Sequence, residues 1–221
     1  MIPKVFHLVW GHDKPLPDYG VKHIAKLKEL YPSWKVKVWL DFPHERVTGD
    51  AMDIAANYGA RSDIMRLEIL HRFGGCYLDV DVEPLKVFPW FDTFSNISCK
   101  QSAGVGSHFI AVPPKSVAMR SALGRINKVV SILPTITKHQ TFVNTGPDMC
   151  SIVFMSCKDM TIIDKPVIEK YFKHHKAGSW LKHEISRSDV KLVGEANLVG
   201  WEESQARLKK GGCCDPVTKD N

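Results

Sequence analysis

Two aspartates stand two residues apart in the stretch 76–82, which reads CYLDVDV. If this stretch forms one β-strand, Asp79 and Asp81 point to the same face of a sheet. Two carboxylates so close repel each other unless a cation or water lies between them. Hard oxygen ligands suit Mg²⁺ or Mn²⁺, which complete their coordination with water and phosphate oxygens. The pair therefore predicts a metal site that holds a diphosphate beyond the carboxyl end of a strand.

Other residue pairs could also take part in chemistry. Asp63 and Arg66 are three apart in a helical pattern, so they share a helix face, where the simplest reading is a surface ion pair. The stretch HHKAGSW, residues 174–180, offers two imidazoles, which can join carboxylates at Mn²⁺. Trp10 ends the first predicted strand, a place where a tryptophan is most often part of the core.

Strands and helices alternate along the chain, which predicts an α/β fold with parallel strand pairs. The spacing of apolar residues predicts strands at 3–10, 35–40, 76–82, 108–114 and 160–164, and helices at 18–31, 50–58, 61–73 and 115–131. Gly74 follows one of these helices, as glycine often does. Residues 140–149 are expected to form a loop before a further helix, and residues 190–194 a further strand.

The composition indicates one globular domain. The chain has 221 residues, of which 44% are hydrophobic, so we expect a single domain over residues 1–210, with 211–221 as a flexible tail or a linker to further domains of a longer chain. No apolar run is long enough to span a membrane, and the start lacks the features of a secretion signal. The six cysteines follow neither zinc nor disulfide spacing. We therefore expect reduced thiols and a cytoplasmic location, which would be the host cytoplasm for a viral chain.

The net charge of +6 is spread along the chain without a basic block. A basic surface attracts charged small substrates as well as polyanions. Arginines do not interleave with aromatic residues as they do in nucleic-acid-binding proteins. We therefore expect no nucleic-acid partner, and a phosphorylated substrate fits the charge better.

Three separated stretches carry a resemblance to a known family. They are IPKVFHLVWGH at 2–12, ARSDIMRLEILHRFGGCYLDVDVEPL at 60–85 and HHKAGSW at 174–180. Together they resemble the DXD-containing glycosyltransferases of the GT-A fold. The similarity is to family 32, which includes capsular sugar transferases, and to the catalytic domains of large clostridial glucosylating toxins. An Asp-x-Asp pair alone would be weak, because chance produces one in roughly half of chains this size.

The resemblance implies a fold and an activity. The GT-A fold is a Rossmann-like α/β fold with a mixed, mostly parallel sheet flanked by helices. The activity would be the metal-dependent transfer of a hexose or deoxyhexose from a nucleoside-diphosphate sugar to a glycan or protein-linked acceptor. UDP-glucose is the first choice of donor, and GDP-mannose and UDP-galactose stay open.

The resemblance also assigns the metal. Asp81 would be the direct ligand of Mn²⁺ or Mg²⁺, and Asp79 would contact the ribose or sugar and the metal, directly or through water. His174 would complete the metal shell, with His175 as the alternative. A divalent cation stabilises the charge that develops on a departing nucleoside diphosphate.

The donor contacts follow in the same way. Asp63 and Arg66 would bind the hydroxyls of the donor sugar, because a carboxylate accepts two hydroxyls and a guanidinium donates in a fork. Trp10 would stack on the base, with Val9 beside it, although LVWGH has one residue fewer in its turn than the FVWIG of the toxins. Tyr77 matches a tyrosine that touches the donor.

The resemblance also implies roles for residues of the C-terminal half, some closing over the donor and others contacting the acceptor or the sugar. Ser179 and Trp180 would close over the pyrophosphate and exclude water. The stretch VNTGPDM at 143–149 places Asn144, Thr145 and Asp148 near the acceptor or the sugar. The resemblance implies retention of the anomeric configuration. An inverting enzyme would need a carboxylate base, for which Asp148 is the candidate.

Two functions of other classes fit part of the pattern. YLDVDV also matches the start of haloacid-dehalogenase-like phosphatases, in which the first aspartate is a nucleophile. That motif normally follows the first strand of a chain, however, and here it follows the third predicted strand. The second alternative is a sugar-nucleotide binder that keeps the fold without turnover.

Overall fold

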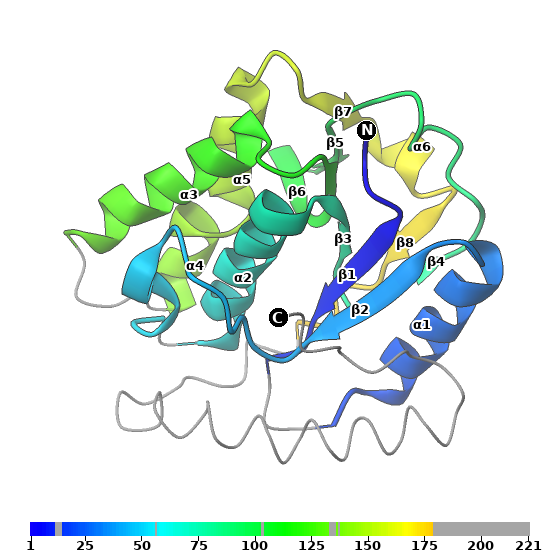
Figure 1. Ribbon diagram of the computed structural model, residues 1–221, viewed down its shortest axis with the longest axis horizontal. Coiled ribbons are helices and arrows are strands. Elements are labelled where there is room, and N and C mark those ends of the chain that lie inside the picture. The colour runs from blue at the N-terminus through cyan, green and yellow to red at the C-terminus, as the bar shows by residue number, and fades with distance from the viewer. Residues whose placement is uncertain (12–14, 56, 103, 133–135, 137, 179–221) are drawn as a thin grey trace.

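The computed structural model describes residues 1–11, 15–55, 57–102, 104–132, 136 and 138–178. A six-stranded sheet with the order β2-β1-β3-β6-β5-β7 passes through the centre of the molecule (Figure 1). Its strands are β1 (Val5–Val9), β2 (Lys35–Trp39), β3 (Gly75–Leu78), β5 (Ile97–Gln101), β6 (Gly104–Val112) and β7 (Thr161–Ile163). β1 pairs in parallel with β2 and β3, β5 pairs in parallel with β7, and β6 is antiparallel to both its neighbours. The predicted mixed, mostly parallel sheet is confirmed.

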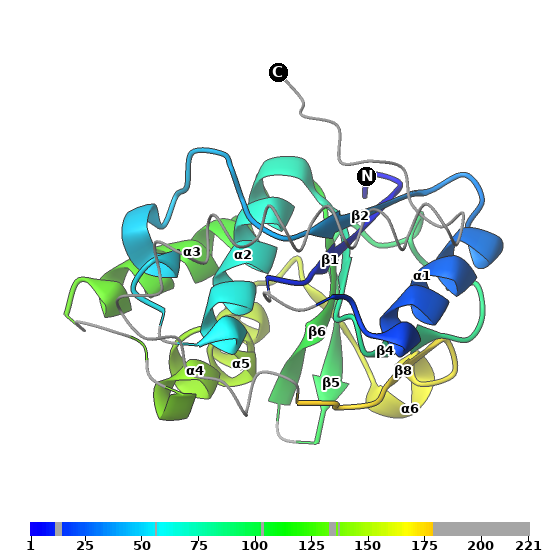
Figure 2. The same cartoon turned by 90° about the horizontal axis from the view of Figure 1, so that it is seen from below.

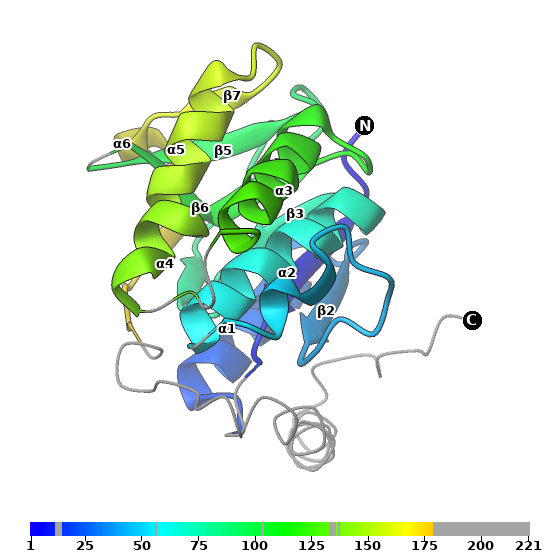
Figure 3. The same ribbon diagram turned by 90° about the vertical axis from the view of Figure 1, so that its left-hand side faces the viewer.

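Helices cover both faces of this sheet, as the edge-on view in Figure 2 shows. One face carries α2 (Tyr58–Phe73), α3 (Val117–Val130) and α5 (Pro147–Ser156), which lie side by side in front of the strands in Figure 3. The other face carries α1 (Asp18–Leu30), α6 (Lys165–Ile168) and a small antiparallel pair of strands, β4 (Val82–Pro84) and β8 (Phe172–His174). The remaining helices are α4 (Lys138–Asn144) and the 3₁₀ helix η1 (Gly49–Met52). Among the described residues, no helix is both long and apolar enough to cross a membrane.

The strands alternate between two apolar clusters because successive side chains point to opposite faces. Tyr77 and Ile110 pack with α2, α3 and α5, whereas Leu78 and Phe109 pack with α1 and the aromatic residues near β4 and β8. All four side chains are at most 1% exposed. A sheet buried on both faces explains why β3 and β6 are apolar almost throughout.

The turn between α2 and β3 depends on two glycines. Asn57 begins α2 by accepting a hydrogen bond from the backbone N–H of Ala60, and Gly74 ends it with a φ of +63°. Gly75 follows with a φ of +96°, and a Cβ there would lie 2.7 Å from the backbone oxygen of Val5. A residue other than glycine would be strained at this positive φ. The two glycines thus allow a tight turn that connects α2 directly to β3, the strand that precedes the aspartates.

The structure corrects the predicted strand at 76–82. β3 ends at Leu78, and residues 79–81 form a turn closed by a hydrogen bond of 2.9 Å from the N–H of Val82 to the carbonyl of Asp79. Strand alternation therefore does not place Asp79 and Asp81 on one face. The turn brings them together instead, and Val80 is buried between them.

Other expected elements also differ. The helix expected at 50–58 is reduced to η1, and the loop expected at 140–149 contains the end of α4 and the start of α5. The short elements β4, β5, β8 and α6 had no counterpart in the prediction. The strand expected at 190–194 lies outside the described residues. The other expected strands and helices are confirmed within a few residues at their ends.

Candidate active site

A cavity of about 360 Å³ opens where β1 and β3 end. Its walls come from the end of β1, from α2, from the turn after β3, from β6 and from the segment after β8. Such crevices beyond strand carboxyl ends are the usual ligand sites of open α/β sheets. Most of the side chains predicted from the sequence to bind a ligand line it: Val9, Trp10, Asp63, Arg66, Tyr77, Asp79, Asp81 and His174.

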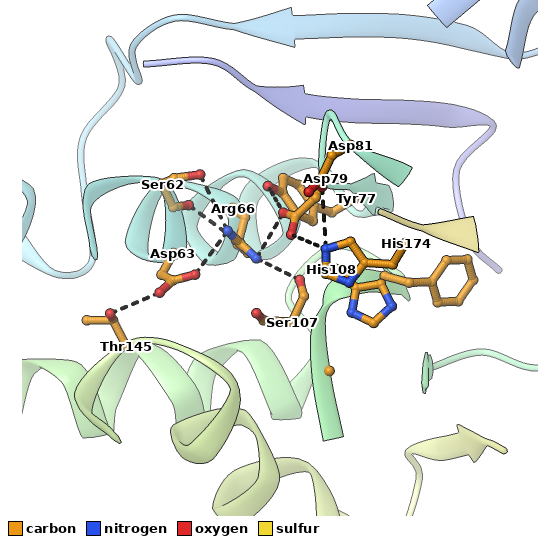
Figure 4. A network of polar contacts seen from close by, with 12 residues as sticks. Ser62, Asp63, Arg66, Tyr77, Asp79, Asp81, Ser107, His108, Thr145 and His174 are labelled. Atoms are coloured by element: carbon orange, nitrogen blue, oxygen red, sulfur yellow. Dashed lines mark hydrogen bonds and ion pairs between the residues drawn. The ribbon is translucent and has the colours of Figure 1, made fainter. Parts of the chain in front are cut away.

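Three metal-ligand groups meet at one end of this cavity. Nε2 of His174 lies 3.4 Å from Oδ1 of Asp81 and 3.9 Å from Oδ2 of Asp79. Adjacent ligands of an octahedral ion with bonds of about 2.1 Å are about 3 Å apart, so this spacing is close to that of a metal shell. Figure 4 shows the imidazole turned toward both carboxylates.

The surroundings of His174 support this interpretation. Its ring stacks on the ring of His108, with a centroid distance of 4.2 Å and an interplanar angle of 19°. Burial and the neighbouring His174 lower the pKa of His108 to about 3, so the underlying ring is neutral. A donor set of two carboxylates and one imidazole fits a divalent cation such as Mn²⁺.

Asp81 is also held by the chain that follows β8. Its Oδ2 accepts a hydrogen bond of 2.6 Å from the N–H of Ala177, and its carbonyl accepts one of 3.1 Å from the N–H of His175. Burial alone would raise the pKa of Asp81, but His174 and the Ala177 N–H outweigh this and hold that pKa below its usual value. Asp81 is therefore a charged carboxylate held in a fixed direction.

Arg66 connects the two ends of the cavity. Its guanidinium lies 2.9 Å from Asp63 and 3.2 Å from Asp79, and it donates a hydrogen bond of 2.8 Å to the carbonyl of Ser107. The same group lies over the ring of Tyr77, 4.5 Å from its centroid. Burial would lower the pKa of Arg66, but the two carboxylates raise it, so the side chain is fully charged. The surface ion pair that the spacing of Asp63 and Arg66 allowed is in fact a buried network.

Asp63 occupies the far side of this network and is 6% exposed. Its Oδ2 accepts a hydrogen bond of 3.1 Å from the hydroxyl of Thr145. Burial raises the pKa of Asp63 to about 6, against the opposing effects of Arg66 and Thr145. Thr145 was expected near the acceptor or the sugar, and the structure buries it against Asp63, where it orients that carboxylate.

The remaining predicted residues are placed differently. Val9 and Trp10 line the cavity, and the indole belongs at the same time to the apolar cluster beneath α1. Asp148 is exposed in the first turn of α5 and, like Asn144, does not line the cavity, so the structure does not bring either one together with the other site residues. Ser179 and Trp180 lie outside the described residues.

Two further cavity residues had not been singled out. Lys176 lies within the HHKAGSW stretch and is the lysine that lines the cavity among the described residues. His108 comes next to the DXD turn because β6 pairs antiparallel with β3, and its carbonyl accepts a hydrogen bond from the N–H of Asp79. Lys176 could have been found from its place in the motif, whereas His108 has no local signal.

Comparison with known proteins agrees with this geometry. Residues 7–100 match the family of glycosyltransferase sugar-binding regions that contain a DXD motif. This part of the chain is similar to the DXD-containing sugar-binding region of glycosyltransferases. The match includes most of β1, α2 and the Asp79–Asp81 turn, which form part of the cavity wall.

Curated relatives of this DXD chain come from two yeasts. A mannosyl phosphorylinositol ceramide synthase of Saccharomyces cerevisiae is 24% identical, over 81% of this chain and 52% of its own length. Inositol phosphoceramide mannosyltransferase 1 of Schizosaccharomyces pombe is also 24% identical, over 81% of this chain and 62% of its own length. The chain thus spans between half and two thirds of the length of these two relatives.

Solved structures similar to this DXD chain confirm the GT-A fold. The PaToxG glycosyltransferase superposes with a TM-score of 0.57 at 16% identity, covering 69% of each chain. The ligand-free glycosyltransferase domain of the YGT toxin gives a TM-score of 0.54 at 10% identity, covering 73% of this chain and 80% of that one. The phosphatase alternative finds no support in the family match or in these folds.

Proposed function

We propose that this chain is a metal-dependent glycosyltransferase that moves a hexose from a nucleoside-diphosphate sugar to an acceptor hydroxyl. The observation that carries the proposal is the convergence of Asp79, Asp81 and His174 in a cavity that the buried Asp63–Arg66 pair also lines. A sugar-nucleotide binder without turnover would use the same residues, and the release of nucleoside diphosphate distinguishes the two functions. The family match and the GT-A fold support the same class of activity.

Asp79, Asp81 and His174 would hold Mn²⁺ or Mg²⁺. When bound, the cation supplies positive charge that stabilises the departing nucleoside diphosphate. Lys176 lines the same cavity and would add a second positive charge for the diphosphate. Ala177 would keep Asp81 in position by its backbone hydrogen bond.

The rest of the donor would follow the length of the cavity. The base would lie against Trp10 and Val9 at the end of β1. The sugar would lie over α2, where Asp63 accepts hydroxyl hydrogen bonds and Arg66 donates them. Asp63 must then be ionised, and Arg66 favours that form while it keeps the carboxylate turned into the cavity.

The stereochemical course proposed here is retention. Among the described residues, the carboxylates lining the cavity are Asp63, Asp79 and Asp81, and each is engaged by Arg66 or His174. An inverting mechanism needs a free carboxylate beside the acceptor. The exposed position of Asp148 gives no support for that role.

The donor and acceptor can be narrowed for testing. The names of the curated relatives favour a mannosyl donor and an inositol phosphoceramide acceptor, whereas the toxin-like stretch LVWGH favours UDP-glucose. GDP-mannose and UDP-glucose are therefore the two donors to compare first, followed by UDP-galactose.

A thermal-shift panel tests the donor site. Wild type, Asp81→Asn and Asp148→Asn are melted with Mn²⁺ and each nucleotide-sugar. A ligand at 100 times its Kd stabilises the folded state by about 2.7 kcal/mol, which raises the midpoint by several degrees. We expect a metal-dependent shift with one donor in wild type and Asp148→Asn, and its loss in Asp81→Asn. Equal shifts in all three proteins would contradict the proposed site.

A further inference from the structure

A second cluster of metal-ligand side chains lies behind the DXD turn. It consists of His23 on α1, Glu83 on β4 and His175 just after β8. Each offers one ligand atom, and these atoms all lie within 4.8 Å of one another. None of the three lines the active-site cavity. The cluster is therefore separate from the Asp79–Asp81–His174 group, although it shares the neighbouring backbone.

His23 is the fixed member of this cluster. The side chain is 9% exposed, and its Nδ1 lies 3.0 Å from the carbonyl of Val80, the residue between the two aspartates. A carbonyl only accepts hydrogen bonds, so Nδ1 carries the proton and Nε2 keeps its lone pair. Metal-binding histidines are commonly oriented in this way by a backbone carbonyl.

Glu83 and His175 are the adjustable members. Nε2 of His175 lies 2.8 Å from Oε2 of Glu83, and the two side chains are 40% and 39% exposed. The ring of His175 lies nearly parallel to that of His23, with a centroid distance of 5.8 Å and an interplanar angle of 19°. The N–H of His175 donates to the carbonyl of Asp81, which fixes the backbone, and the half-exposed ring is held by its contacts with Glu83 and His23.

We propose that His23, Glu83 and His175 form a second divalent-metal site of the zinc type. Two imidazoles and one carboxylate are a common zinc ligand set, with water in the fourth position. Bonds of about 2.0 Å place tetrahedral ligands about 3.3 Å apart, so the cluster closes on an ion through rotation of the two exposed side chains. His175 then serves this site, while His174 serves the site at the aspartates.

Such an ion would join three separate segments of the chain. His23 belongs to α1, Glu83 to β4, and His175 to the segment that also carries the Ala177 N–H bound to Asp81. A bound ion would therefore stabilise the fold and hold the DXD turn from behind. This role is independent of the donor and of transfer.

The test measures Zn²⁺ binding to the full chain by competition with a chromogenic chelator, without any nucleotide-sugar. The background protein carries Asp79→Asn and Asp81→Asn, which remove the other metal site. It also carries Cys213→Ser and Cys214→Ser, which remove two thiols that are consecutive in the sequence. Glu83→Gln and His175→Gln are then compared with Glu29→Gln, an exposed glutamate on α1. Circular dichroism and thermal melting verify that each variant is folded.

We expect one equivalent of Zn²⁺ to bind to the background protein and to raise its melting midpoint. Glu83→Gln and His175→Gln should each weaken binding at least about 10-fold, as loss of a metal-site contact generally does, and Glu29→Gln should leave it unchanged. Absence of Zn²⁺ binding to the folded background protein would overturn the proposal, as would equal affinity in Glu83→Gln and Glu29→Gln. Because no donor is present, either result leaves the proposed transfer reaction to be judged separately.

Discussion

Tyr77 donates a hydrogen bond of 2.7 Å to Oδ1 of Asp79, so the two oxygens of that carboxylate have different surroundings. Oδ1 also lies 3.2 Å from Arg66, so it faces the protein, whereas Oδ2 faces His174. The buried tyrosine thus determines which oxygen of Asp79 is presented to a metal (Figure 4).

Replacing this tyrosine should weaken metal binding without unfolding the protein. Tyr77→Phe removes the hydrogen bond that orients Asp79, and loss of such a supporting contact typically costs about 10–100-fold in metal affinity. Calorimetric titration with Mn²⁺ measures the effect. Tyr31→Phe is the matched control, because Tyr31 is also buried and its hydroxyl accepts a 2.7 Å hydrogen bond from the N–H of Phe88, away from the metal site. Each variant should lose about 1 kcal/mol of stability, but only Tyr77→Phe should lose Mn²⁺ affinity.

Arg66 should not be replaceable by lysine. Its planar guanidinium contacts Asp63, Asp79 and the Ser107 carbonyl at the same time. The single ammonium group of lysine cannot make these three contacts together. Arg66→Lys should lower turnover by about 10²–10³-fold, the usual cost of losing a preorganised electrostatic contact. Steady-state kinetics with the donor identified by thermal shift measures this. Arg46→Lys, at a half-exposed pair with Asp53, should change neither turnover nor stability.

A glycine on α1 sets the position of the DXD turn. A Cβ at Gly20 would lie 2.6 Å from Cγ1 of Val80, so Gly20→Ala should displace the turn. Overpacking of this kind costs about 1–3 kcal/mol, and Mn²⁺ affinity should fall with it. A Cβ at Gly124 on α3 would meet no atom within 4 Å. Gly124→Ala should therefore stabilise the protein by about 0.5–1 kcal/mol, because glycine is unfavourable within a helix. Denaturant unfolding and Mn²⁺ titration of both variants check this contrast.

Asp63 should titrate well above an ordinary aspartate. Its pKa of about 6 lies above the usual aspartate value of 3.8 because the group is buried. The folded state therefore binds this proton more tightly than the unfolded chain does. That contribution to stability is complete below about pH 4 and is lost as the pH rises through about 6.

Carboxyl carbon NMR of the labelled protein measures this pKa directly. Thr145→Val removes a hydrogen bond that lowers the pKa of Asp63, so the midpoint should move upward in that variant. A midpoint near 4 for Asp63 in the wild type would show that the group is not buried as described.

Local features of the site were predictable, and features that depend on distant pairing were not. The helix carrying Asp63 and Arg66 has a clear helical period and ends at Gly74, so its position follows from short-range rules. The break after Leu78 was missed because Val80 is as apolar and as buried as a strand residue. The sequence therefore predicted that the two aspartates lie together, but it attributed this to strand alternation, whereas a turn brings them together.

The histidines illustrate the same limit. Two histidines in succession give no local reason to choose between them. His174 faces the aspartates because β8 pairs with β4 in the register that sets His174 opposite Val82, while His175 turns toward Glu83. His108 reaches the site through the β3–β6 pairing. Each of these placements depends on pairing between strands that are far apart in the sequence. The periodicity of apolar residues does not predict such pairing.

The proposed function requires metal-dependent cleavage of a nucleotide-sugar at the Asp79–Asp81–His174 group. The most direct measurement is the release of nucleoside diphosphate from GDP-mannose and UDP-glucose, with Mn²⁺ or with a chelator, by wild type, Asp81→Asn and Asp148→Asn. Asn can still accept the Ala177 hydrogen bond, so Asp81→Asn removes the charge while keeping the turn in place. We predict release with one donor only when Mn²⁺ is present, a fall of at least about 100-fold in Asp81→Asn, and full activity in Asp148→Asn. Release that continues in the chelator, or that is unchanged in Asp81→Asn, would contradict the account.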